Sequence, residues 1–140
     1  MDVHTPEQRR FNMSRIKGAG TRPERLVADW FLAEGFQVRC NDPDLPGRPD
    51  IVLPDVHTVL FMHGCFWHGH EDCRYFKLPA TRTQFWRDKI AGTMVRDQKK
   101  TSELRTLGWE VLVVWECELK PKVRQETLAR LTQTILEGAE

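Results

Sequence analysis

Residues 49–63 read Pro49-Asp50-Ile51-Val52-Leu53-Pro54-Asp55-Val56-His57-Thr58-Val59-Leu60-Phe61-Met62-His63. Two apolar runs, 50–53 and 58–62, lie on either side of a Pro-Asp turn signal, which predicts a pair of strands. If the connection is a short antiparallel one, partner residue numbers sum to about 113, and Asp50 lies opposite Met62 or His63. The stretch therefore predicts a carboxylate and an imidazole at one end of a hairpin.

The rest of the chain adds helix and strand signals around this hairpin. Thr21-Arg22-Pro23-Glu24 has the form of a capping box, and a helix with apolar spacing follows it as far as Gly35. We further expect a strand at 36–40, a helix at 83–107, a buried strand at 109–115 and a last helix at 125–137. The order α-β-β-β-α-β-α predicts a single α/β domain over residues 1–140, with a mixed β-sheet flanked by helices in three layers.

Length and composition restrict the class of protein. A chain of 140 residues with 40% hydrophobic residues can form one core without disulfides. The first residues lack a basic start followed by an apolar run, and no apolar stretch approaches the roughly 20 residues that cross a bilayer. We therefore expect a cytoplasmic monomer that does not contact the membrane.

The net charge of +1 hides an uneven distribution. Residues 74–105 hold nine basic against three acidic side chains, and residues 1–25 hold six against three, whereas residues 29–55 hold six acidic against two basic. Clustered Lys and Arg favour nucleic-acid binding because they release counterions from phosphates. The distribution suits a molecule with one phosphate-facing side, although a solvated helix face gives the same pattern.

Residues 64–82 show little periodicity, and so long a loop in a compact domain is usually functional. The loop contains thiols and imidazoles close together: Cys65, His68, His70 and Cys73. Zinc binds such a mixture, and Cys117, just past a predicted strand, is available as a further ligand. A structural zinc is therefore predicted, the alternative being buried cysteines and surface histidines. Cys40 has no ligand-type neighbour and is interpreted as an inert core thiol.

The predicted pairing of Asp50 with His63 suits hydrolysis of a phosphodiester. That reaction needs a hard cation such as Mg²⁺ on a carboxylate, and a group of near-neutral pKa that takes a proton from water. Asp50 and His63 fit these two roles, with His68 as a second acid or base. An aspartate after a proline is also a common turn residue, but the neighbouring His63 and the zinc loop favour the catalytic interpretation.

Four strings closely resemble the bacterial very-short-patch repair (Vsr) endonucleases and keep their order and spacing. They are Leu45-Pro46-Gly47-Arg48-Pro49-Asp50, His63-Gly64-Cys65-Phe66-Trp67-His68, Pro79-Ala80-Thr81-Arg82-Thr83-Gln84-Phe85-Trp86, and Gly108-Trp109-Glu110-Val111 through Trp115-Glu116-Cys117. The resemblance extends from about Asn12 to Cys117. It implies the PD-(D/E)xK restriction-endonuclease-like fold, with His63 in place of the usual lysine.

The resemblance also implies catalytic roles. Asp50 would bind Mg²⁺ together with the backbone carbonyl of Met62, while His63 and His68 would transfer protons and stabilise the phosphate. Glu24 would hold metal-bound water, although its place in the capping box explains it without chemistry.

For zinc, the resemblance implies a four-residue ligand set: Cys65, His70, Cys73 and Cys117. This chain has two residues, Glu71 and Asp72, between the histidine and the next cysteine, where the family pattern has one. His68 therefore stays open as the alternative ligand.

A mismatch-reading surface is the last implication. Phe66 and Trp67 lie in a polar, glycine-rich loop, so their rings are expected to point outward and wedge between base pairs. By resemblance, Trp86 joins them from the major groove and Met13 inserts from the minor groove, within a DNA-contacting segment at residues 1–20. Packing in the core is the other interpretation of Trp86. Arg82 is expected to bind backbone phosphate.

Together with the residues above, the resemblance implies a Mg²⁺-dependent, strand-specific endonuclease that nicks 5′ to the mismatched thymine of T:G mismatches, in the repair of deaminated 5-methylcytosine. Its partners would be double-stranded DNA carrying the mismatch, and mismatch-repair proteins. One alternative is a sequence-specific nicking or restriction enzyme of the same fold that cuts matched duplexes equally fast. Another is a zinc-stapled DNA-binding module without catalysis, which Asp50 beside His63 argues against.

Overall fold

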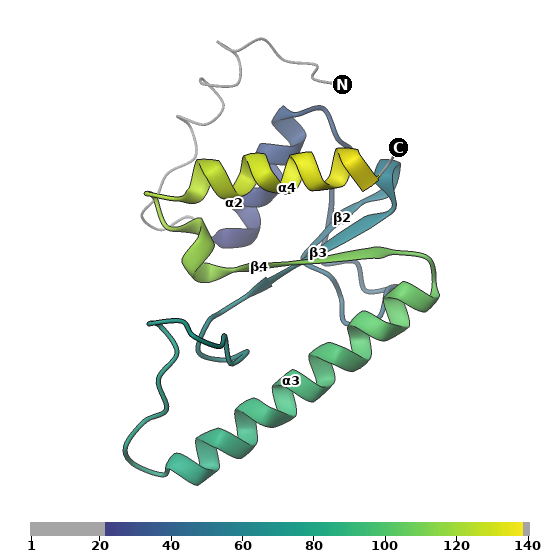
Figure 1. The fold of residues 1–140 in the computed structure, drawn as a ribbon. Helices are drawn as coiled ribbons and strands as arrows, with labels where there is room; N and C mark the ends of the chain where they lie inside the picture. The colour runs from purple at the N-terminus through teal and green to yellow at the C-terminus, as the bar shows by residue number, and fades with distance from the viewer. Residues whose placement is uncertain (1–21, 139–140) are drawn as a thin grey trace.

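The computed structural model describes residues 22–138, in which a four-stranded sheet lies between helices on both faces (Figure 1). The elements are α2 (Pro23–Ala33), β1 (Arg39–Cys40), β2 (Ile51–Leu53), β3 (Thr58–His63), α3 (Thr83–Thr106), β4 (Glu110–Trp115) and α4 (Arg124–Gly138), with 3-10 turns η1 (Pro54–Val56) and η2 (Glu116–Leu119). The predicted α/β class with a mixed sheet in three layers is confirmed. The proposed DNA-contacting segment 1–20, including Met13, lies outside the described residues.

The strand order is β1-β2-β3-β4, and the pairing is mixed. β2 pairs antiparallel with β1 and with β3, whereas β4 pairs parallel with β3. α3 makes the crossover that a parallel pair requires. The parallel register runs from Thr58 opposite Glu110 to His63 opposite Trp115, so the two strands end side by side.

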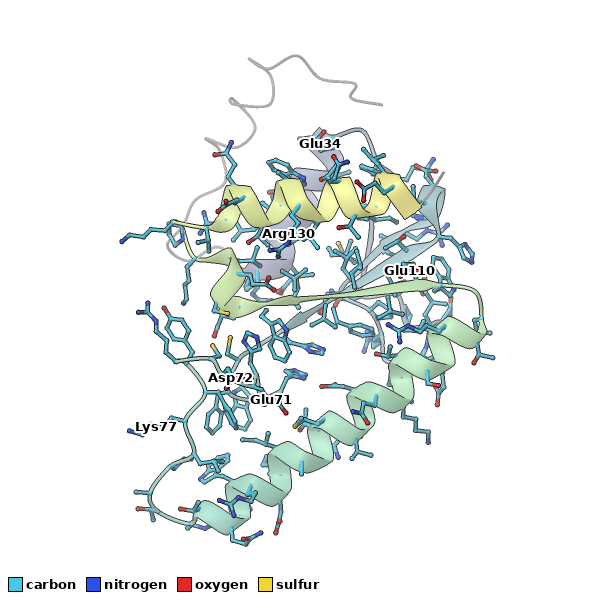
Figure 2. All side chains as sticks on the ribbon, in the orientation of Figure 1. Glu34, Glu71, Asp72, Lys77, Glu110 and Arg130 are labelled. Atoms are coloured by element: carbon cyan, nitrogen blue, oxygen red, sulfur yellow. The ribbon has the colours of Figure 1, made fainter. Side chains whose placement is uncertain are left out.

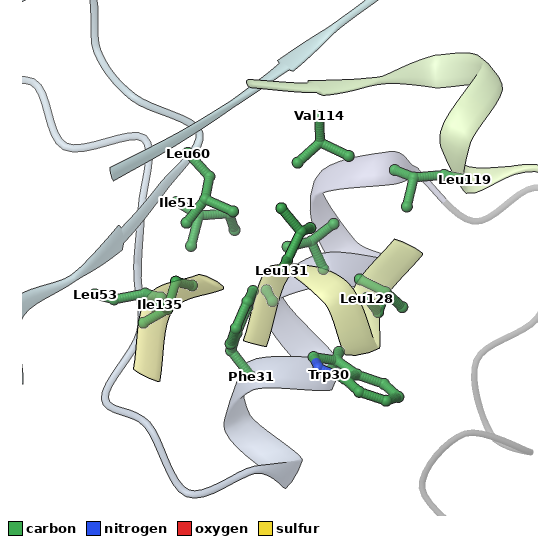
Figure 3. Packing of buried hydrophobic residues seen from close by; sticks show 12 residues of the cluster. Trp30, Phe31, Ile51, Leu53, Leu60, Val114, Leu119, Leu128, Leu131 and Ile135 are labelled. Carbon is green, nitrogen blue, oxygen red and sulfur yellow. The ribbon is translucent and has the colours of Figure 1, made fainter. Parts of the chain in front are cut away.

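Side chains alternate between the two faces of the sheet and form two separate apolar clusters. The larger cluster lies against α2 and α4 (Figure 3) and includes Phe31, Ile51, Leu53, Leu60, Val114 and Leu128. The smaller one lies on the α3 side and consists of Val52, Val59, Leu104 and Val111, with partly buried neighbours. Most of the buried apolar surface therefore stabilises the α2 and α4 side.

α3 is long and polar, and of its 24 residues Ile90 and Leu104 are buried. Its N-terminal half extends away from the sheet (Figure 1), and the loop 64–82 fills the space beside it. Gly69 makes the closest approach with a φ of +64°, since a Cβ there would lie 2.8 Å from Ile90 Cγ2. A glycine is therefore required where the loop packs on α3.

None of the described helices has the length and apolarity needed to span a bilayer.

The hairpin register differs from the prediction. Ile51 pairs with Leu60 and Leu53 with Thr58, which places Asp50 level with Phe61 rather than with Met62 or His63. The reason is the connection, because η1 and a left-handed His57 close a four-residue turn between the two strands. The Asp50 side chain nevertheless reaches along β3 to the main chain of Met62.

One local prediction lies partly outside the described residues, and another is wrong. α2 has Arg22 as its N-cap and Pro23 as its first residue, one residue later than the capping box implies, and Arg22 provides no side-chain cap; Thr21 lies outside the described residues. Cys40 is exposed instead of buried, because β1 is a two-residue edge strand and both of its residues are exposed.

Candidate active site

Asp50 immediately precedes β2, and its carboxylate is held against β3. The Met62 N–H donates a hydrogen bond of 2.7 Å to Asp50 Oδ2. Burial raises the pKa of Asp50, the Met62 N–H lowers it, and the negative charge of Glu24 raises it again, with a net upward shift. A cation bound to this half-buried carboxylate would offset both its desolvation and its repulsion by the charge of Glu24.

Two imidazoles lie beside this carboxylate. The rings of His63, at the end of β3, and His68, in the following loop, are stacked with centroids 3.9 Å apart and planes 3° from parallel. Burial and the positive charge of His68 lower the pKa of His63 to about 4, while Asp97 opposes that shift. His63 is therefore neutral near pH 7, with one ring nitrogen free to accept a hydrogen bond.

Asp97 of α3 orients the second imidazole. His68 Nδ1 lies 2.7 Å from Asp97 Oδ2, and both side chains are mostly buried. A carboxylate at Nδ1 favours the tautomer with its proton on that nitrogen, which leaves Nε2 free as a proton acceptor. The sequence prediction missed Asp97. The available signal is its spacing, since it lies seven residues from both Ile90 and Leu104 and thus on the inner face of α3.

These groups line one cavity of about 250 Å³. Its charged and titratable members are Arg48, Asp50, His63, His68, Asp97 and Lys100, which come from the two hairpin strands and their flanks, the loop and α3. Carboxylates, imidazoles and cations are the groups that hydrolysis of a phosphodiester uses. Glu24, in the first turn of α2, does not line the cavity and acts on Asp50 through its charge.

A second group of side chains forms a candidate metal centre. One ligand atom from each of Cys65, His70, Cys73 and Cys117 lies within 4.8 Å of all the others. Cys117 Sγ is 3.5 Å from His70 Nδ1. Zinc bonds of about 2.3 Å to sulfur and 2.0–2.1 Å to nitrogen at a tetrahedral angle imply a sulfur to nitrogen distance of about 3.5 Å. The four side chains therefore fit a closed tetrahedral site, while His68 is engaged with Asp97.

The three thiols of this centre influence one another. Burial and hydrogen bonds to Cys65 and Cys73 raise the pKa of Cys117 to about 12. Burial also raises the pKa of Cys65. Desolvation opposes ionisation of Cys73, but N–H groups of Tyr75 and Phe76 and the other two thiols lower its pKa overall. Without a cation, one thiolate thus suppresses the others, and a metal ion would allow all three to ionise.

Trp115, at the end of β4, connects the two groups. The His70 ring stacks on it with centroids 4.0 Å apart, and the His63 ring meets it edge-on at 5.2 Å. The His70 N–H also donates to the Cys65 carbonyl, which closes the loop around the thiols. Figure 2 shows the loop residues Glu71 and Asp72 at this end of the sheet, toward α3.

The aromatic residues expected to read DNA lie together. Phe66, Trp67 and Trp86 contact one another with centroid distances of 5.2–5.6 Å, and Trp67 is 51% exposed. Trp86 is partly exposed in the first turn of α3, so it is not a core residue. Arg82, the N-cap of α3, places its guanidinium over the ring of Phe85, which contacts Trp86. The structure thus groups the aromatic cluster, Phe66, Trp67 and Trp86, with a basic residue nearby.

Comparison with known proteins supports a DNA-cutting enzyme. The sequence profile described as DNA mismatch endonuclease Vsr matches residues 1–74. The chain is 45% identical over 142 residues to the DNA mismatch endonuclease Vsr of Escherichia coli (strain K12), covering 99% of this chain and 90% of that protein. It is also 47% identical over 118 residues to the type II nicking enzyme V.XorIIP of Xanthomonas oryzae pv. oryzae, covering 84% and 86%. Identity to the type II nicking enzyme V.NmeAIP of Neisseria meningitidis is 44% over 138 residues, covering 98% of each chain.

The fold, the carboxylate and imidazole site and these relatives define a DNA endonuclease. The relatives share most of their length with this chain, so the likeness is not limited to one motif. The chain belongs to the Vsr family of DNA mismatch endonucleases.

Proposed function

We propose that this protein nicks one strand of duplex DNA on the 5′ side of the thymine of a T:G mismatch, with Mg²⁺ as cofactor. The observation that carries the proposal is the adjacency of two features. The cavity that combines Asp50 with the His63 and His68 pair shares two segments with the exposed aromatic cluster. Trp67 immediately precedes His68 in the loop, and Trp86 belongs to the same helix as Asp97. The similarity to a relative named as a mismatch endonuclease supports the same substrate.

Asp50 and the main-chain carbonyl of Met62 are the groups that would hold Mg²⁺, which prefers hard oxygen ligands. The raised pKa of Asp50 and the nearby charge of Glu24 fit a site that favours a cation. When bound there, Mg²⁺ would neutralise charge on the phosphate and lower the pKa of a water molecule. These features are those expected of a site in the PD-(D/E)xK class.

We assign the proton transfer to His68. In hydrolysis, a water oxygen bonds to phosphorus, and the bond from phosphorus to the leaving sugar oxygen breaks. His68 Nε2 takes the proton of the attacking water, since Asp97 holds the other ring nitrogen, and the leaving oxygen gains a proton from solvent. His63, which is neutral near pH 7, donates its single ring N–H to the phosphate.

Zinc is the ion that the thiolate and imidazole centre suits best. All four ligand positions would be supplied by protein, which is typical of a structural site and leaves no open position for catalysis. The ion would tie the loop 64–82 to the end of β4 through Cys117. It would thereby hold His68 and Trp67 in place.

Mismatch selection is assigned to the aromatic cluster. A T:G wobble pair is easier to unstack than a Watson–Crick pair, so a rigid aromatic wedge discriminates without reading every base edge. Trp67 is exposed and is braced by Phe66 and Trp86. The contribution of Met13 from the minor groove stays a prediction.

A second candidate is nicking of matched DNA, favoured by the relatives named type II nicking enzymes. Initial nicking rates on T:G, C:G and A:T duplexes of otherwise identical sequence, in several contexts and with or without Mg²⁺, distinguish the candidates. We expect Mg²⁺-dependent cleavage of the T:G duplex alone. Equal rates on matched duplexes would favour the second candidate, and binding without cleavage would leave a DNA-binding module.

A further inference from the structure

Lys100 lines the active-site cavity together with Asp50, His63 and His68. It comes from α3, whereas Asp50 and His63 come from the hairpin. In the predicted assignment of roles, histidine replaces the lysine that is usual for this fold, and no cation from α3 has a part. A lysine of α3 nevertheless lines the cavity.

Gly47 keeps the Lys100 stem beside the cavity. A Cβ at position 47, where φ is +76°, would lie 3.0 Å from Lys100 Cβ and 3.1 Å from its Cγ. The turn before Asp50 therefore packs directly on this lysine, with no room for a larger residue. A methylene stem that is held along a surface while its ammonium stays solvated is a common arrangement for lysine.

No strong ion pair competes for the ammonium. Within residues 22–138, Lys100 pairs with Glu103 at 3.8 Å, and both side chains are about 40% exposed, at 42% and 38%. Exposed pairs of this kind are weak. Arg48 is the other cationic residue that lines the cavity; it is exposed and has a φ of +50°. The lysine is thus free to exchange its solvent contact for a phosphate.

We propose that Lys100 is a catalytic residue that contacts a non-bridging oxygen of the scissile phosphate. The inference rests on the proposed nuclease function and deepens it. As water adds to phosphorus, negative charge grows on these oxygens, which Asp50 and Asp97 cannot stabilise. An ammonium placed there favours the transition state more than the bound substrate, so it acts on turnover more than on binding.

Lys100→Met and Lys99→Met form a matched pair for the test. Both remove one positive charge from the same helix, but Lys99 is exposed and does not line the cavity. The measurement is single-turnover nicking at saturating protein, with Kd for the same duplex and thermal melting measured in parallel. We expect Lys100→Met to slow nicking by about a hundredfold, as loss of a transition-state donor does, and Lys99→Met to change it by less than about threefold.

Both variants should weaken DNA binding equally and slightly, because each loses one phosphate-attracting charge. Lys100→Arg should recover part of the rate, since it restores the charge. Equal rates for the two Met variants, or a Lys100→Met defect confined to Kd, would overturn the inference. If the wild type nicks a duplex without the mismatch, the proposed T:G substrate is refuted. The Lys100 inference is then tested by comparing the same variants on that matched duplex. A wild type that cleaves nothing refutes both.

Discussion

Replacing Asp97 by asparagine removes the carboxylate that fixes His68 while keeping its shape. In the structure, Asp97 Oδ2 lies 2.7 Å from His68 Nδ1, and the two side chains are 29% and 25% exposed. An asparagine can turn its amide NH₂ toward the ring, which moves the imidazole proton to Nε2. His68 would then present a donor where the reaction needs an acceptor.

The size of the effect follows from two limits. A hydrogen bond to a charged group contributes about 1.5–3 kcal/mol, and partial exposure places this one near the lower value. Since about 1.4 kcal/mol is a factor of ten in rate, loss of orientation alone costs at least about tenfold. Complete loss of a general base costs up to about 10⁴-fold. We expect Asp97→Asn to lie between these limits, near a hundredfold.

Single-turnover nicking of a T:G duplex measures the effect, with Asp88→Asn as control. Asp88 is an exposed acid on the same helix that contacts Gln84 and does not line the cavity. Duplex affinity should stay within about threefold for both variants, because removal of one negative charge alters only the general electrostatic attraction. Asp97→Asn activity within threefold of wild type would refute the assignment of His68 as an Asp97-oriented base.

Further predictions concern the metals and the wedge. The purified protein should contain one zinc, and Cys117→Ser or His70→Ala should lower zinc content and melting temperature together, because ligand binding is coupled to folding; active wild type without zinc would contradict the site. Asp50→Ala should abolish nicking at any Mg²⁺ concentration and leave affinity within a few fold, and residual cleavage above about a tenth would place the metal carboxylate elsewhere. Burial raises the pKa of Asp50, so the ionised carboxylate lowers the free energy of unfolding, whereas the protonated carboxyl group does not. In buffer without Mg²⁺ at pH 7, Asp50→Asn should therefore have a higher melting temperature than wild type. Calorimetry should show that this difference disappears as the pH falls below about 4, the ordinary pKa of Asp. An unchanged or lower melting temperature at pH 7 would argue against a destabilising ionised Asp50. Trp67→Ala should weaken T:G binding by about ten- to a hundredfold and matched binding much less, and an equal loss on both duplexes would make the ring a packing residue.

The hairpin shows what the sequence can and cannot predict. Its two apolar runs predict the strands, and the strands form nearly where expected. The register depends on the conformation of the connection, where η1 and a left-handed His57 are one of several turns compatible with Pro54-Asp55. The predicted register of Asp50 is therefore wrong by one or two residues. The hydrogen bond from the Met62 N–H shows that the Asp50 side chain still reaches the site.

The candidate metal centre was predictable because its chemistry lies in residue types and spacing. Cys65 and Cys73 are close in sequence, and Cys117 follows a predicted strand. Residue types and spacing left His68 and His70 as alternative ligands, and His70 was favoured only by the family resemblance. The proposed proton-transfer pair was harder to predict, since Asp97 lies in a helix, 29 residues from His68 along the chain. An acidic residue on a basic, polar helix gives no compositional signal, so the sequence indicates the inward orientation of Asp97 only through its spacing from Ile90 and Leu104.

The weak attachment of α3 has a dynamic consequence. With two buried residues on this helix and a small cluster beneath it, its amide hydrogens should exchange with solvent through local opening well before those of the sheet and α4. Asp97 and Lys100 would leave the cavity in each such opening, while Asp50 and His63 stay in place on the hairpin. The free protein would thus spend part of its time with an incomplete cutting machinery. DNA that bridges the helix and the hairpin would complete it and slow the exchange.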